Sequence, residues 1–123
     1  QHDSAEPIGF LLSSVDGDKV LYATDTYYIR YKFPGLTHSL VEANHSYEIL
    51  DRNVSNGWLD PRLKNRLIKS HFSLENLKEF FLANDLKAVR EIWLIHLSDG
   101  NSDEQQFKKE IAELTGKPVY IAG

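Results

Sequence analysis

The chain has 123 residues, a formal net charge of −4 and 41% hydrophobic residues, which fits one folded domain and excludes the disordered class. The negative charge argues against nucleic-acid binding by bulk electrostatics, although an acidic metal site with a basic rim remains compatible with it. No segment approaches the roughly 20 apolar residues of a membrane helix, and the N-terminus lacks a signal pattern. Without cysteine, histidine and carboxylate must hold any metal, and a cytoplasmic location fits.

Strand and turn patterns dominate the first third of the chain. Residues 8–14 (IGFLLSS) and 20–25 (VLYATD) predict two strands joined by a turn at Asp16–Gly17. Residues 38–44 (HSLVEAN) predict a third, short and buried strand. The sequence contains no methionine, so we expect a processed start or a domain cut from something longer, and the strand-like opening supports the second option.

Helical patterns follow. Residues 47–54 place their apolar side chains on one helical face, and Asp60–Pro61 starts a short second helix with a cap and a proline at its first position. Residues 73–84 predict the clearest helix, with Ser73 as its N-cap. Its buried face is predicted to comprise Leu74, Leu77, Phe80 and Phe81.

The last third alternates strand, helix and strand. Residues 89–98 (VREIWLIHLS) are apolar on both faces, as in a parallel sheet. Residues 102–116 predict a helix that begins with a Ser102–Gln105 capping box and ends at Gly116. Its predicted buried stripe comprises Phe107, Ile111 and Leu114. With a final strand over 117–123, the order predicts an α/β fold in which helices pack on one face of a mixed sheet.

Two predicted strands end in a side chain that can bind a metal, namely Asp25 and His96. Active sites in open α/β sheets gather at strand ends, and a carboxylate with an imidazole suits zinc or manganese. Taken alone, each residue has a structural alternative. A strand-end aspartate is more often a turn or cap residue, and a histidine at the edge of the core is more often simply hydrogen-bonded.

Other histidines have two interpretations each. His71 precedes a predicted helix N-terminus, where backbone N–H groups favour an anion such as phosphate. His45, near Glu42, could act in proton transfer. The structural alternatives are a surface residue beside a cap for His71 and a helix-start residue for His45, while His38 looks like a loop residue without a role.

Basic residues concentrate just ahead of His71 in an otherwise acidic chain. They are Arg52, Arg62, Lys64, Arg66 and Lys69. A solvated helix face is the default interpretation. The alternative is a basic rim beside a phosphate-binding site.

Taken in order, several segments resemble the C-terminal half of the metallo-β-lactamase-fold hydrolases, in the branch of the YycJ-like exonucleases and, more distantly, the tRNA 3′-processing nucleases. HDSAEPIGFLL is similar to the strand that opens the second half, and YATDT is similar to the fourth motif. LVEANHSYEIL resembles the following segment, SHFSLENLKEFF a histidine-plus-helix element, and LIHLSDGNSD the fifth motif. The likeness covers nearly the whole of residues 1–123.

The resemblance implies roles for individual residues. Asp25 would bridge two metal ions, zinc or manganese, and His96 would be a terminal metal ligand. His71 would meet the scissile phosphate as a catalytic residue, oriented by Glu42. The segments also contain substrate-binding candidates, which are His45, Ser73 and Asn101.

The chain departs from the family in one large respect, because the first-half signature HxHxDH and the third-motif histidine are absent. It offers about two ligands where zinc takes about four. We therefore expect residues 1–123 to be half of the αββα sandwich, inactive alone, and completed by an N-terminal half or another copy.

The resemblance implies a phosphodiesterase or nuclease that acts on DNA ahead of RNA. One alternative is a non-catalytic α/β interaction module, whose exposed sheet edge and face would need a partner. Another is a small-molecule ester or thioester hydrolase of the same fold. Only a polyanionic substrate needs a basic rim, so that rim separates nuclease from esterase.

Overall fold

The elements follow the predicted order. The computed structural model describes residues 8–13, 17–24 and 35–122, and this part of the chain contains five strands and four helices. They are β1 (Ile8–Ser13), β2 (Lys19–Thr24), β3 (His38–Glu42), α1 (Tyr47–Ser55), α2 (Pro61–Ser70), α3 (Leu74–Ala83), β4 (Glu91–Ile95), α4 (Glu104–Thr115) and β5 (Val119–Ile121).

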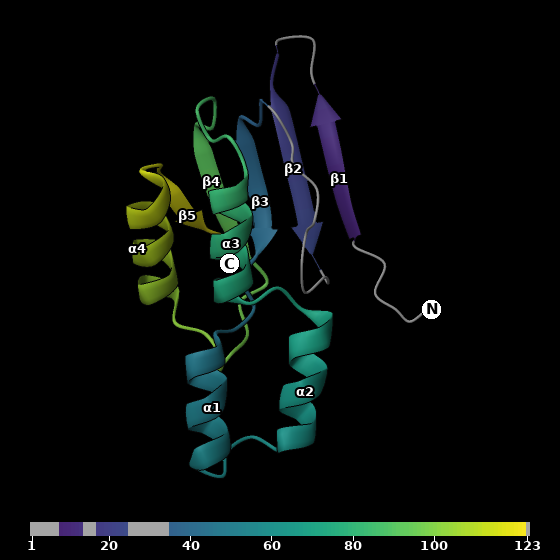
Figure 1. The fold of residues 1–123 in the computed structure, drawn as a ribbon, viewed down its shortest axis with the longest axis vertical. Helices are drawn as coiled ribbons and strands as arrows, with labels where there is room; N and C mark the ends of the chain where they lie inside the picture. The colour runs from purple at the N-terminus through teal and green to yellow at the C-terminus, as the bar shows by residue number, and fades with distance from the viewer. Residues whose placement is uncertain (1–7, 14–16, 25–34, 123) are drawn as a thin grey trace.

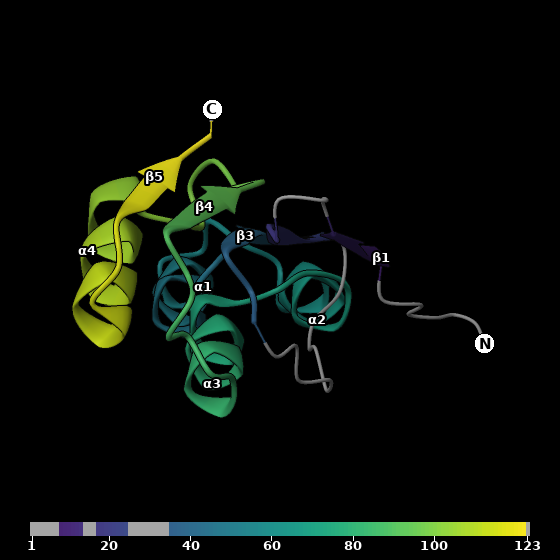
Figure 2. The ribbon, with the colours of Figure 1, turned by 90° about the horizontal axis from the view of Figure 1, so that it is seen from above.

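The strands form one mixed sheet in the order β1-β2-β3-β4-β5. β1 pairs antiparallel with β2, and the other neighbouring strands pair in parallel. The helical connections after β3 and β4 both step to the next strand in the same direction. Since such crossovers are right-handed, their helices must lie on the same face. Figure 2 shows all four helices on one side of the sheet, which confirms the predicted α/β fold.

The hydrophobic core lies between the sheet and helices α3 and α4. Alternate strand residues such as Leu21, Val41 and Ile92 point into it. The four apolar residues predicted for α3 are all buried, and Ser73 caps the helix by accepting a hydrogen bond from the Asn76 N–H. Each fully buried leucine or phenylalanine contributes roughly 1.5–3 kcal/mol, so this layer stabilises the sheet end that carries the site.

The opposite face of the sheet carries a row of apolar side chains. Tyr22, Leu40, Trp93 and Tyr120 pair in register across β2 to β5, and the rings of Trp93 and Tyr120 stack with centroids 4.8 Å apart. No helix of the described chain lies over this row (Figure 2).

α1 and α2 form a helical hairpin that extends past the carboxyl ends of β2 and β3 (Figure 1). As predicted, Asp60 caps α2 through the Arg62 N–H, and Pro61 occupies the first helical position. None of the described helices combines the length and apolar composition that crossing a bilayer requires.

The predicted start of α4 is wrong by one residue. Asp103, not Ser102, is the N-cap, and its carboxylate accepts a hydrogen bond from the Gln106 N–H. A carboxylate also interacts favourably with the helix dipole. The Ser102 hydroxyl instead donates to the Ser98 carbonyl. The predicted end is confirmed, because Gly116 adopts φ +70° at the C-cap.

The predicted burial of Leu114 is also wrong. Phe107 and Ile111 are fully buried, whereas Leu114 is 37% exposed. α4 packs near the edge strand β5, so its last turn has little sheet to cover (Figure 2).

We expect Ile111→Ala to lower the free energy of unfolding by about 2–5 kcal/mol, because it leaves a cavity in the core. Leu114→Ala removes the same type of side chain from a partly exposed position and is expected to cost less than about 1 kcal/mol. Denaturant unfolding of both variants measures the difference. Equal destabilisation of the two variants would contradict the packing of α4.

Candidate functional site

Three chain segments meet at the carboxyl edge of the parallel strands. β3 ends at Glu42, which pairs with Ile95, the last residue of β4, and His96 follows directly. His71 is the C-cap of α2, in the short turn before α3. Strand register therefore brings Glu42 and His96 together, and the turn between two helices adds His71.

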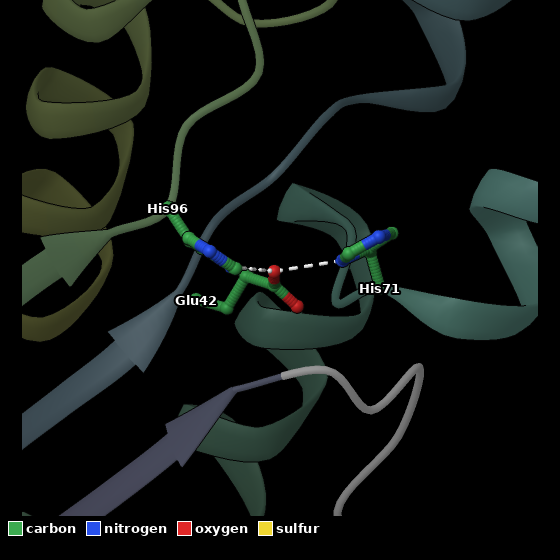
Figure 3. A group of neighbouring side chains, drawn as sticks. All are labelled: Glu42, His71 and His96. Carbon is green, nitrogen blue, oxygen red and sulfur yellow. Dashed lines mark hydrogen bonds and ion pairs between the residues drawn. The ribbon is translucent and has the colours of Figure 1, made fainter.

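The carboxylate of Glu42 joins both imidazoles (Figure 3). Its Oε2 accepts hydrogen bonds from Nδ1 of His71 at 2.8 Å and from Nδ1 of His96 at 2.7 Å. Its Oε1 accepts from the Phe72 N–H at 2.9 Å. The Glu42 side chain is 0% exposed, while those of His71 and His96 are 26% and 56% exposed. The group thus opens from a buried carboxylate toward solvent.

These residues could hold a metal ion. Their ligand atoms all lie within 4.8 Å of one another, and two imidazoles with a carboxylate are a donor set that zinc and manganese accept. Two ligands at a tetrahedral ion, each about 2.0–2.1 Å from it, are roughly 3.3 Å apart. The separations of 2.7 and 2.8 Å are those of hydrogen bonds, so direct coordination through Nδ1 would require the rings to move outward.

The backbone at His96 is strained. His96 has φ +62°, and no other non-glycine residue of the described chain has a positive φ. A left-handed conformation costs a non-glycine residue on the order of 1–2 kcal/mol, and such strain persists where the surrounding structure over-determines it. The conformation lets the chain leave β4 sharply at the edge of the sheet.

Asn44 supplies the hydrogen bonds that hold this conformation. Its side-chain Nδ2 donates to the His96 carbonyl at 3.1 Å, and its own carbonyl accepts from the Ser98 N–H at 2.9 Å. Its backbone N–H donates to the Phe72 carbonyl at 2.9 Å, one residue after His71. Asn44 therefore fixes both histidine-bearing segments relative to β3.

His45 lies behind the cluster. It is 0% exposed, and its Nδ1 donates to Oδ1 of Asn44 at 3.1 Å, while its Nε2 has no hydrogen-bond partner among the described residues. Burial lowers the pKa of His45 from its usual 6.5 to about 4, and the charge of His71 acts in the same direction. His45 is therefore neutral at pH 7. No part of its side chain reaches the surface. Its role in substrate binding stays a prediction.

Two other predicted site residues have structural roles. Ser73 is buried, and its hydroxyl is used in capping α3. Asn101 ties the β4–α4 loop to α1, because its Oδ1 accepts from Asn53 and its carbonyl accepts from the Ser46 N–H. Substrate binding by either residue stays a prediction.

Asp25 lies outside the described residues. Its neighbour Thr24 is the last residue of β2, which runs parallel to β3 and ends at the same edge of the sheet. The metal-bridging role of Asp25 stays a prediction.

Sequence reasoning missed two features of this site. It associated Glu42 with His71 and His45 but not with His96, which Glu42 also binds. It placed Asn44 near the site through the resemblance without giving it a role. Part of the signal for the first was available, because Glu42 and His96 both lie near the ends of predicted strands. The hydrogen bonds of Asn44 depend on the positive φ of His96, which no local sequence pattern predicts.

A scan against models of known protein families finds no match for this chain, and no curated protein matches it either. The resemblance to metallo-β-lactamase-fold hydrolases therefore stays a prediction.

We expect acid to destabilise the protein through His45. Its pKa is lower in the folded chain, so between pH 6.5 and about 4 the unfolded chain binds more protons. The stability present above pH 6.5 is lost as the pH falls to about 4, by roughly 3 kcal/mol at about 1.4 kcal/mol per pH unit. The free energy of unfolding of His45→Asn should lack this dependence on pH. The same slope in His45→Asn as in the control His38→Asn would contradict it.

We expect Asn44→Ala to weaken metal binding by about 10- to 100-fold, the usual cost of removing a group that orients a ligand. The control is Asn53→Ala, which removes side-chain bonds to Gly100 and Asn101 but none to His96. Titration with zinc, alongside circular dichroism to confirm folding, separates the two. Equal affinities would show that Asn44 does not position His96.

Proposed function

We propose that this chain carries part of the active site of a metal-dependent hydrolase, and that the bond it hydrolyses is a phosphodiester of a nucleic acid, DNA ahead of RNA. The observation that carries the proposal is one buried carboxylate holding two imidazoles at the carboxyl edge of a parallel sheet. Ligand and catalytic sites of open α/β folds gather at this edge.

The hydrogen bonds favour an orienting role for Glu42 over direct coordination. A carboxylate can only accept, so it selects the ring form with a proton on Nδ1, and in the neutral ring Nε2 is then the Lewis base. Histidines that bind metals commonly donate their other N–H to a carboxylate in this way. We assign His96 Nε2 to the metal ion, zinc or manganese, together with Asp25 and ligands beyond the described residues.

His71 acts on the substrate. Held by Glu42 and partly exposed, it stabilises charge on the phosphate and donates a proton to the leaving oxygen. Glu42 keeps the ring in position through its 2.8 Å hydrogen bond to Nδ1. A divalent ion, when bound, would supply the charge that lowers the pKa of the attacking water.

The basic residues of α2 support a polyanionic substrate. α2 leads directly into His71, and a small ester or thioester would gain nothing from a basic helix at this place. An ester hydrolase would otherwise use the same residues, so the substrate assignment depends on α2.

The described residues do not supply a full set of metal ligands, and the proposal includes a source for the remaining ones. The apolar row on the helix-free face supports a second protein layer there, as the sandwich architecture requires. We propose that this layer, an N-terminal half of the same fold, supplies them.

We expect zinc or manganese binding to weaken about tenfold or more in His96→Ala. The control is His38→Ala, which removes a histidine hydrogen-bonded to Thr37, at the other end of β3. Isothermal titration of both variants, each made in the natural full-length protein, gives the comparison. Metal affinity that is equal in the two variants would refute the metal site.

Hydrolysis is tested in the natural full-length protein with p-nitrophenyl thymidine monophosphate and with a DNA oligonucleotide. We expect chelation, Asp25→Ala, His96→Ala and His71→Ala each to abolish cleavage, and His38→Ala to leave it unchanged. Hydrolysis of a carboxylic ester, without phosphodiester cleavage, would favour the esterase.

A further inference from the structure

The α1–α2 hairpin has features that the cluster chemistry does not use. It extends away from the sheet, and its connecting loop lies at the far end from the cluster (Figure 1). That loop carries Trp58, whose side chain is 85% exposed. Tryptophan is highly buried on average, so an indole this exposed at the tip of a hairpin is available for contact with a partner.

α2 adds a second observation. None of its residues is buried, so the helix contributes little to the core of the described chain. Between residues 60 and 70 it carries four basic residues and only one acidic residue, in a chain of net charge −4. Arg62 is almost fully exposed beside its cap partner Asp60, and Lys64 pairs with Asp51 on α1. Two of the four basic side chains are thus paired with the carboxylates of Asp60 and Asp51, and the surface of α2 keeps an excess of two positive charges that is complementary to an anionic partner.

An exposed indole combined with a row of cations fits one kind of partner best. Proteins that bind single-stranded nucleic acid stack bases on aromatic rings and track the phosphates with basic side chains. A double helix would hide its bases from Trp58, and a small anion would not need the indole.

We propose that the α1–α2 hairpin binds single-stranded nucleic acid, with a base stacked on Trp58 and the phosphates following α2 toward His71. The direction toward His71 rests on the proposed function, whereas binding to the hairpin does not.

The length of α2 sets the number of nucleotides that fit between Trp58 and His71. Its ten residues span about 15 Å, and stacked nucleotides follow one another at about 3.4 Å. A strand that reaches from Trp58 to His71 is therefore about four nucleotides long. Trp58 should affect substrates longer than this and have no effect on shorter ones.

Binding is measured by tryptophan fluorescence. The chain has two tryptophans, and Trp93 stacks on Tyr120 in the sheet, so Trp93→Phe leaves Trp58 as the only reporter. We expect an oligo(dT) of about twelve nucleotides to quench it, and a blunt duplex of the same length to have little effect. Trp58→Ala should weaken oligo(dT) binding by roughly tenfold or more in a fluorescence-anisotropy titration.

A salt titration tests the contribution of α2. Removing one basic side chain that neutralises a phosphate reduces the steepness of log K against log salt by about 0.7 for a single strand. Arg62→Ala/Arg66→Ala should reduce the steepness accordingly. The matched control is Lys108→Ala/Lys109→Ala, which removes the same charge from exposed positions on α4. An equal reduction in both double variants would overturn the role of α2.

The outcomes separate the hairpin from the catalytic proposal. If Trp58→Ala leaves oligo(dT) affinity unchanged while His96→Ala abolishes hydrolysis, the hairpin proposal fails and the hydrolase stands. If Trp58→Ala weakens cleavage of long oligonucleotides but not of p-nitrophenyl thymidine monophosphate, both stand. The third outcome is that the wild type binds oligo(dT) through Trp58 but hydrolyses neither substrate, and that His96→Ala binds oligo(dT) equally well. In that case the hairpin proposal stands and the hydrolase fails. Self-association that depends on Trp58, without nucleic-acid binding, would replace the strand with a protein partner.

Discussion

The fully buried carboxylate of Glu42 is the interaction on which the site depends. A charge withdrawn from water is costly unless donors replace its hydration. Here the donors are two imidazole N–H groups and the backbone N–H of Phe72, and they come from the β4 exit and the α2–α3 turn. Three segments distant in sequence are therefore held to one group, and removal of any donor would leave the carboxylate partly unsatisfied.

Behind this group, a neutral layer holds the geometry without adding charge. Burial keeps His45 neutral, and its ring holds Asn44 in the orientation that fixes the strained backbone of His96. Glu42 binds the two outer histidines, and these three residues are the group that could hold a metal ion.

Local chemistry made much of the fold predictable, and long-range register made part of the site unpredictable. Asp60–Pro61, Ser73 and Gly116 mark helix ends through their own capping and backbone preferences. Ser102 and Asp103 are adjacent candidates for the N-cap of α4. The Ser102 hydroxyl donates to the Ser98 carbonyl in the preceding loop, and Asp103 accepts the capping hydrogen bond from the Gln106 N–H. Glu42 and His96 lie near the ends of predicted strands, but the register of β3 against β4 and the positive φ of His96 are not encoded in a short segment. Asp25 lies beyond what the structure describes.

The hairpin and the cluster are mechanically connected. Residues 43–70, which include α1 and α2, form a loop whose two ends are joined by the 2.8 Å bond between Glu42 and His71. The carboxylate of Glu75 on α3 also accepts from the Tyr47 N–H and so anchors the first turn of α1. The direction in which the hairpin extends is consequently set at the cluster itself. The bond that orients His71 is thus one of the hydrogen bonds that hold the base of the hairpin against the edge of the sheet, together with those from the Asn44 and Tyr47 N–H groups.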